Sequence, residues 1–240
     1  MKSVCNPLFA LFVIVFLSAC EKQDDIQNQA SSSEATVAQS EVNTTQASIE
    51  SSVLVPWKEG THYKVLEQEL TQSPVVVEYF SFWCPACYNF EPLAKEIERQ
   101  LGTEVAFQKV HVNFMGLASK QSQELATLGM AIARHLNNET LVNASIFSKI
   151  HQERQNITTI DDIKSIFLSL NVSEKDFLAA AESDEVVAIY EANNALIDTN
   201  REDLNGVPNF IVNGKYQATF TRDMNAQDVI ELIKWLSQQQ

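Results

Sequence analysis

Residues 75–87 read VVVEYFSFWCPAC and decide the fold of this chain. The apolar, β-branched and aromatic run over residues 75–83 is typical of a buried strand. Apolar residues then recur at helical spacing over residues 85–101, which predicts a helix. The sequence therefore places Cys84 and Cys87 where a buried strand passes directly into a helix.

A two-residue gap across the first turn of a helix brings the sulfurs of Cys84 and Cys87 close enough to bond. Pro85 suits the first helical position, where a missing N–H costs nothing. Cys84 lies at the positive end of the helix dipole, which favours its thiolate and makes it the attacking or leaving sulfur. The pattern predicts a thiol–disulfide exchange site whose thiol pKa values are tuned by the intervening Pro85 and Ala86.

Two other interpretations of the cysteine pair remain open at this stage. A structural disulfide across a four-residue loop would constrain the unfolded chain little and stabilise the fold little. A zinc site would need two more ligands at a recognisable spacing. No cysteine follows Cys87, and the four histidines form no paired motif. Redox chemistry is favoured, and we expect neither a metal nor a cofactor.

The N-terminus has the anatomy of an export signal. A basic start at Lys2 precedes an unbroken apolar run over residues 8–17, which is too short to span a bilayer. The sequence Leu17-Ser18-Ala19-Cys20 resembles the bacterial lipobox, so we expect residues 1–19 to be a lipoprotein signal peptide and Cys20 to be lipidated. An ordinary secretory signal cleaved near Ala19 is the alternative.

These features predict a periplasmic protein anchored to a membrane by lipid. An aspartate directly after the lipidated cysteine would resemble an inner-membrane retention signal. This chain has Glu21 at that position, which mildly favours the outer membrane. Cys5 would leave with the signal peptide and Cys20 would carry lipid, so the CxxC pair would supply the remaining thiols. An exported protein with one CxxC motif fits a catalyst in an oxidising compartment.

Composition separates a tether from a folded part. Residues 21–55 are rich in Ser, Thr, Gln and Asn and lack aromatic residues, Gly and Pro, which predicts a flexible tether. A long solvated helix is the alternative, without an apolar stripe to support it. The remaining stretch suits one sizeable domain or a domain with an insertion. The net charge of −14 argues against nucleic acid as a partner, and we expect a monomer.

The order of the predicted elements indicates an α/β fold interrupted by helices. Strands are predicted at residues 62–66, 75–80 and 105–110, and later at 209–212 and 216–220 around the turn Asn213-Gly214. Helical periods alone occupy the region between these groups. They predict helices over residues 125–136, 141–150 and 160–170, one long helix from Ser173 through Ile189, and a final helix that starts near Asn225 with Asp228 as its capping partner. Pro92 is expected to kink the helix that follows the CxxC motif rather than end it.

Three motifs in register resemble the DsbA family of periplasmic thiol:disulfide oxidases. They are EYFSFWCPACY at residues 78–88, HVNFMG at 111–116 and GVPNFIVNGKY at 206–216. The resemblance extends from about Trp57 to the C-terminus. It implies a thioredoxin fold with an inserted α-helical domain, divided into residues 56–114 and 196–240 for the thioredoxin part and 115–195 for the insert.

The resemblance also implies roles for individual residues. Cys84 would be the nucleophile that forms a mixed disulfide with substrate, and Cys87 its shielded partner. Val207-Pro208 resembles the cis-proline loop of the family, which would present the Val207 backbone to an unfolded substrate; an ordinary Gly-x-Pro turn is the alternative. Glu78 and Lys109 match a buried acid and base of the family that can tune thiol pKa values, whereas two solvated charges at strand ends would be the structural alternative.

One residue departs from the family pattern. The best-known members carry histidine where this chain has Ala86, and alanine can neither donate to the Cys84 thiolate nor carry a positive charge near it. We therefore expect a higher Cys84 pKa and a less oxidising couple than in members with histidine.

The predicted function is an oxidase that donates its disulfide to reduced or unfolded secreted proteins. The family resemblance implies reoxidation by a DsbB-type membrane quinone reductase. A disulfide isomerase or reductase of the same fold is one alternative, although Val207 before the proline and the short tether argue against an isomerase. A membrane-tethered module that binds unfolded proteins is another, in which the cysteines would be incidental.

Overall fold

The structure, a computed structural model, describes residues 57–239 of the chain. The predicted signal peptide, the proposed lipidation site Cys20 and the predicted tether lie outside the described residues. Within residues 57–239, no helix combines the length and the apolar character needed to cross a membrane.

A mixed five-stranded sheet forms the centre of the fold. Its strands are β1 (Tyr63–Val65), β2 (Val75–Phe80), β3 (Ala106–His111), β4 (Asn209–Val212) and β5 (Tyr216–Ala218). They are arranged in the order β1-β5-β4-β2-β3. Only the β2–β3 pair is parallel among these neighbours; the other pairs are antiparallel.

Strand β2 is apolar except for Glu78 because both of its faces are covered. Val76 packs into a cluster with α1 (Pro85–Leu101) and α7 (Ala226–Ser237) on one face of the sheet. Val77 and Tyr79 pack on the opposite face against α6 (Asp184–Asn200), where Ile197 covers them. This two-sided burial explains why the strand lacks the apolar–polar alternation of a half-exposed strand.

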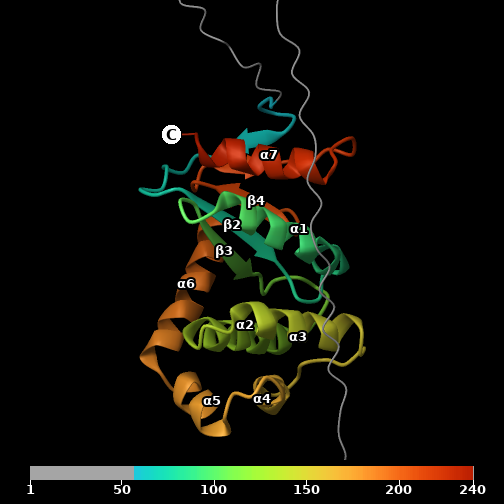
Figure 1. Ribbon diagram of the computed structural model, residues 1–240, viewed down its shortest axis with the longest axis vertical. Helices are drawn as coiled ribbons and strands as arrows, with labels where there is room; N and C mark the ends of the chain where they lie inside the picture. The colour runs from blue at the N-terminus through green and yellow to red at the C-terminus, as the bar shows by residue number, and fades with distance from the viewer. Residues whose placement is uncertain (1–56, 240) are drawn as a thin grey trace, which may run out of the picture. The chain divides into compact units, whose positions relative to one another are not determined.

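The helices between β3 and β4 form a layer beyond one end of the sheet (Figure 1). They are α2 (Lys120–His135), α3 (Glu139–His151), α4 (Ile160–Ser169) and α5 (Glu174–Ala181), and we call these four helices the helical insert. Figure 1 shows α2 and α3 next to the sheet, α4 and α5 farther away, and α6 running from the insert back to the sheet. Phe80 and Phe82 join the core of the insert, where they contact Phe147 of α3. The strand–helix junction thus enters the core of the insert.

The prediction of one long helix from Ser173 through Ile189 is wrong. The chain forms two helices there, because α5 ends at Ala181 and α6 begins at Asp184. Ser183 separates them: its hydroxyl accepts a hydrogen bond from the N–H of Val186 at 3.2 Å and caps α6. A serine that bonds the backbone two or three residues ahead starts a helix rather than continuing one.

The other predicted elements agree with the structure to within two residues, with one exception. The helix predicted over residues 125–136 begins five residues earlier, at Lys120 of α2, because its first turn is polar and lacks the apolar spacing that marked the helix. Helix α1 continues through Pro92 to Leu101, so the proline does not end it. Asn225 and Asp228 form the expected capping box at the start of α7. Asn213 and Gly214 both have positive φ (52° and 71°), as a tight hairpin turn requires. The connection is one residue longer than a two-residue loop, since Val212 pairs with Tyr216.

Candidate active site

Cys84 and Cys87 occupy the start of α1, and both are free thiols. Cys84 is the N-cap residue and Pro85 takes the first helical position, as expected. The N–H of Cys87 donates to the Cys84 sulfur at 3.2 Å. Cys84 is 6% exposed and Cys87 is fully buried, so an approaching group can reach only Cys84.

The environment separates the pKa values of the two thiols. The Cys87 thiol donates to the Cys84 sulfur and, with backbone N–H groups of Cys87 and Ala86, lowers the pKa of Cys84 to about 6 despite the opposing effect of burial. The same contact raises the pKa of Cys87, and burial and the negative charge of Glu78 raise it further. At neutral pH the pair therefore holds one thiolate, on Cys84, and one thiol, on Cys87.

The predicted proline loop lies against the reactive cysteine. The peptide bond between Val207 and Pro208 is cis. The Cys84 sulfur lies 3.4 Å from the carbonyl oxygen of Val207, to which it donates when it is protonated. Residues 123 positions apart in sequence are thus adjacent in the site.

Glu78 and Lys109 form a buried ion pair, so the alternative of two solvated charges is wrong. The parallel register places Glu78 of β2 opposite Lys109 of β3, and the Lys109 Nζ lies 2.7 Å from Glu78 Oε2. Glu91 of α1 also binds the ammonium group, with its Oε1 2.5 Å from Nζ. Sequence reasoning missed Glu91. Its position four residues after Cys87 on the same helix face was the available signal.

Burial and charge act in opposite directions on this cluster. Burial raises the pKa of Glu78, against the attraction and hydrogen bond of Lys109. Burial alone would lower the pKa of Lys109, but Glu78 and Glu91 outweigh it and raise the pKa. Lys109 therefore stays protonated, and Glu78 is the member whose proton affinity burial increases.

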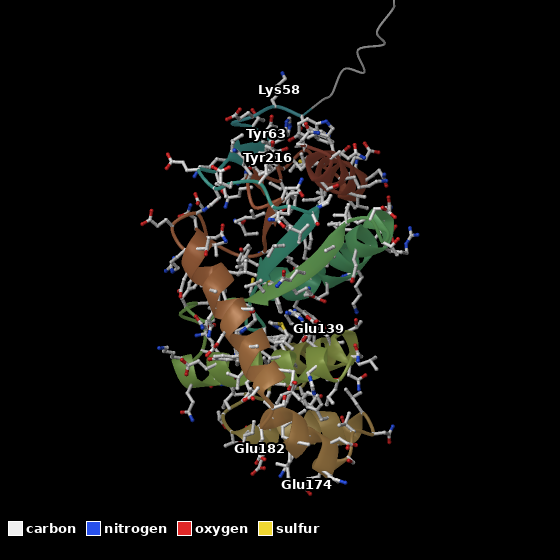
Figure 2. The ribbon with its side chains drawn as sticks, turned by 90° about the vertical axis from the view of Figure 1, so that its left-hand side faces the viewer. Lys58, Tyr63, Glu139, Glu174, Glu182 and Tyr216 are labelled. Carbon is white, nitrogen blue, oxygen red and sulfur yellow. The ribbon has the colours of Figure 1, made fainter. Side chains whose placement is uncertain are left out.

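A cavity of about 310 Å³ opens beside the ion cluster between α1, β3 and the first helices of the insert. Its lining includes Glu91, Lys109, Arg134 and Glu139. Arg134 donates to the backbone carbonyl of Lys109 at 2.9 Å and forms a bidentate pair with Glu139. Figure 2 shows Glu139 where the helical layer meets the sheet. The ion cluster thus borders a polar cavity rather than a closed apolar core.

His111 is a buried neutral histidine in the wall of the site. Its Nδ1 lies 2.8 Å from the Thr127 hydroxyl, which itself donates to the carbonyl of Gln123 at 3.0 Å. Because that hydroxyl proton is already used, the His111 Nδ1–H must be the donor to Thr127. Burial lowers the pKa of His111 to about 3, so the ring stays uncharged at neutral pH.

Among residues 57–239, no group of three or more His, Cys, Asp or Glu side chains is placed to hold a metal ion.

Comparison with known proteins identifies relatives with the same motif order. A family described as "DSBA-like thioredoxin domain" matches residues 75–231. The thiol:disulfide interchange protein DsbA of Escherichia coli K12 is 32% identical over 192 residues, which cover 76% of this chain and 89% of that protein. DsbA of Haemophilus influenzae is 31% identical over 187 residues, which cover 75% of this chain and 87% of that protein.

Solved structures resemble the fold as well. DsbA from Proteus mirabilis, solved in complex with a non-covalently bound peptide, aligns with a TM-score of 0.68 and 26% identity and covers 77% of this chain and 100% of that one. DsbA from Klebsiella pneumoniae aligns with a TM-score of 0.67 and 24% identity, over 76% of this chain and 98% of that one. Together with the paired thiols beside a cis-proline loop, these likenesses show that the chain belongs to the DsbA-like thioredoxin family and is a thiol:disulfide oxidoreductase whose thioredoxin fold is interrupted by helices.

Proposed function

We propose that the protein donates its Cys84–Cys87 disulfide to reduced, newly exported proteins. A substrate thiolate attacks the Cys84 sulfur, the Cys84–Cys87 bond breaks, and Cys87 takes the electron pair and a proton. A second substrate thiolate then attacks the substrate sulfur of the mixed disulfide, and Cys84 leaves as a thiolate. The substrate loses two electrons and the protein gains them.

The separation of the two thiol pKa values is the observation that carries this proposal. A thiol whose pKa is near 6 is a good leaving group, so Cys84 releases an oxidised substrate readily. In the mixed disulfide, burial and the negative charge of Glu78 still raise the pKa of Cys87, so Cys87 keeps its proton and reverses the first step slowly. Stabilising the reduced form makes a disulfide more oxidising.

We assign substrate binding to Val207 and Pro208. The Val207 carbonyl already lies beside the Cys84 sulfur, so an extended peptide paired with this backbone would present its cysteine to Cys84. The Proteus mirabilis relative binds a peptide non-covalently, which supports a peptide substrate here. An extended backbone contact would accept many sequences, as a protein that acts on unfolded chains requires.

We propose that the charged cluster of Glu78, Lys109 and Glu91 exchanges protons with the Cys87 thiol. Glu78 raises the pKa of Cys87 through its charge and is held by Lys109, which Glu91 also binds. The polar cavity beside Glu91 and Lys109 gives this cluster a route for proton exchange with solvent. Pro85 and Ala86 complete the set of residues that tune the thiols, through the helix start and its backbone N–H groups.

Location and partners form a further part of the proposal. The signal anatomy supports a periplasmic protein that is lipidated at Cys20 after removal of residues 1–19 and held by a tether over residues 20–55, with the outer membrane favoured. We also propose domain boundaries at 56–114, 115–195 and 196–240, a monomeric state, and reoxidation by a DsbB-type quinone reductase.

The equilibrium reduction potential of the Cys84–Cys87 couple tests the direction of electron flow. The mature chain would carry Cys20→Ser, so that it lacks the lipid, and would be equilibrated with glutathione buffers. Thiol labelling would then measure the fraction of protein with reduced cysteines. We expect a potential towards the value of DsbA, about −120 mV, rather than that of thioredoxin, about −270 mV. A value near the thioredoxin end would reverse electron flow and favour a reductant or isomerase.

A second arm of the same experiment separates catalysis from simple binding. The Cys84→Ser, Cys87→Ser double variant keeps the fold and the proline loop but cannot exchange disulfides. We expect it to lose all oxidation of a reduced, unfolded client. Full client protection by this variant in cells would favour the tethered binding module instead.

A further inference from the structure

The end of α3, in the helical insert, contacts the reactive segment, residues 82–88. The CxxC motif alone does not predict this contact. His151, the last residue of α3, places its Nε2 2.8 Å from the backbone carbonyl of Phe82. A carbonyl oxygen can only accept, so Nε2 carries the proton and donates it. The acceptor lies two residues before Cys84, although Phe82 and His151 are 69 positions apart in sequence.

The same imidazole also contacts the other end of the motif. Tyr88 directly follows Cys87, and its ring stacks on His151 with centroids 4.8 Å apart and planes at 9°. The neighbouring Gln152 donates to the Tyr88 hydroxyl. His151 thus touches the chain on both sides of the two cysteines with a single ring.

The segment that His151 holds sets the geometry of the reactive sulfur. The N–H of Cys84 donates to the carbonyl of Ser81 at 3.0 Å, and the N–H of Trp83 donates to the Ser81 hydroxyl at 3.3 Å. This turn gives Cys84 its N-cap conformation (φ −87°, ψ 114°), in which the sulfur faces the N–H of Cys87. The carbonyl of Phe82 lies in the middle of that turn, so its orientation and that of the N-cap are coupled.

We propose that His151 is a positioning residue for thiol–disulfide exchange: by donating to the Phe82 carbonyl while stacked on Tyr88, it holds the Cys84 sulfur against the first turn of α1. This function differs from that of a histidine between the two cysteines, because His151 contacts Phe82 and Tyr88 and not the sulfur atoms. The proposal rests on the exchange activity alone and holds for either direction of electron flow.

The contact of Trp83 supports the same interpretation independently of His151. Its indole N–H donates to the side-chain oxygen of Asn156 at 2.9 Å, in the loop that follows α3. Residues 82, 83 and 88 therefore all bond or stack with the segment from His151 to Asn156. The reactive turn is supported by the insert as well as by its own helix.

Two variants that differ by one methylene group test the role of the Nε2 donor. In His151→Gln the side-chain amide reaches the position of the imidazole Nε2 and can donate to the Phe82 carbonyl. In His151→Asn the amide reaches only the position of Nδ1 and cannot. Both side chains are polar, and the site is partly buried, so both should fold. His135→Gln, at the end of α2, is the control for loss of a histidine from the insert.

The readouts are the pH midpoint of the Cys84 thiolate, followed by its ultraviolet absorbance, and the equilibrium constant with glutathione. We expect His151→Asn to raise the midpoint by about one pH unit, which corresponds to a tenfold smaller oxidising equilibrium constant. His151→Gln and the His135 control should stay near the native values. The proposal fails if His151→Asn matches the native protein, or if the Asn and Gln variants shift equally.

Discussion

Cys84 and Cys87 receive opposite effects from one contact. The hydrogen bond from the Cys87 thiol to the Cys84 sulfur stabilises a negative charge on Cys84 and makes the Cys87 proton harder to remove. The two sulfurs therefore titrate as a pair, and the pair ionises once over the accessible pH range. Residue identity does not distinguish the two cysteines; their position on the helix and their burial do.

Ala86 is the residue at which the thiol chemistry can be changed with least effect on the fold, since its side chain is exposed. We expect Ala86→His to lower the Cys84 pKa, because an imidazolium or imidazole N–H stabilises the thiolate. Each unit of pKa is about 1.4 kcal/mol and makes the couple about 30 mV more oxidising. Equilibration with glutathione measures the change.

Ala86→Asn is the control for Ala86→His, because an amide can donate but cannot become a cation. It should shift the potential less than histidine does. An unchanged or more reducing potential in the histidine variant would contradict the argument that alanine makes this couple less oxidising.

Residue-scale prediction succeeded where partners are close in sequence: local sequence placed the cysteine pair and Pro85 at the start of a helix. For Glu78 and Lys109, only the family resemblance pointed to a buried acid and base, and the structure places them in one ion pair. Glu91 was missed although helix spacing pointed to it. His151 could not be predicted, because its contact with Phe82 depends on how α3 packs against the strand–helix junction. Tertiary packing, not local propensity, creates that contact.

At the scale of elements, the packing of α2 against α4 depends on a glycine. A Cβ at Gly129 would lie 3.0 Å from Cδ1 and 3.1 Å from Cγ2 of Ile163. Ile163 is fully buried, so its side chain has little room to move. The glycine lets the two helices approach closely despite its poor helix propensity.

We expect Gly129→Ala to destabilise the protein by about 1 kcal/mol. Alanine improves helix propensity by about 1 kcal/mol, but overpacking a core costs about 1–3 kcal/mol. Urea unfolding measures the free energy difference. Gly116→Ala is the matched control, since a Cβ there meets nothing within 4 Å and should leave stability unchanged or slightly higher. Equal or greater stability of Gly129→Ala would show that Ile163 yields at no cost.

The division of the predicted long helix into α5 and α6 shows what limits prediction of elements. Residues on both sides of Ser183 have good helix propensity, and the apolar spacing continues across it. The hydrogen bonds of Ser183 separate the helices: its hydroxyl accepts from the N–H of Val186 in α6 and donates to the carbonyl of Ala180 in α5. A polar residue within a helical pattern is ambiguous until its hydrogen-bond partner is known.

At the scale of the whole molecule, His111 makes stability depend on pH. Its pKa is about 3 in the folded protein, whereas an unfolded chain restores the ordinary value near 6.5. Between these values the unfolded state binds a proton that the folded state does not. His111 therefore contributes full stability above about pH 6.5 and loses it as pH falls, by up to about 1.4 kcal/mol per pH unit.

The His111→Asn variant isolates this effect, because asparagine keeps a donor near the position of Nδ1 for Thr127 and has no titrating group. The variant should be less stable near pH ~7, since the lost ring leaves a cavity. The difference from the native protein should narrow as pH falls towards ~4.5. Urea unfolding at a series of pH values gives the two curves. Parallel curves would show that His111 is not buried and neutral.

The pH dependence of the variant's stability must be compared with that of the native protein, because other groups change the stability in the opposite direction. The pKa of Glu78 is raised by burial, so the folded protein binds that proton more tightly than the unfolded chain. Glu78 contributes its full stabilisation below the pKa that its carboxyl has in the unfolded chain. That stabilisation declines as pH rises through the pKa of Glu78 in the folded protein. Only the difference between the two proteins reports on His111.

The path of α6 has a consequence for anyone who would shorten the chain. Asn193 of α6 bonds both backbone groups of His111, accepting from its N–H and donating to its carbonyl, each at 3.0 Å. Asn200 donates to the Tyr79 hydroxyl at 2.7 Å. A deletion that joined β3 directly to β4 would strip these buried groups of their partners and uncover the face of the sheet beneath Ile197. The insert therefore cannot be removed at the proposed boundary between residues 195 and 196, which would divide α6. A shortened version must cut no later than Ser183 and keep α6 packed on the sheet.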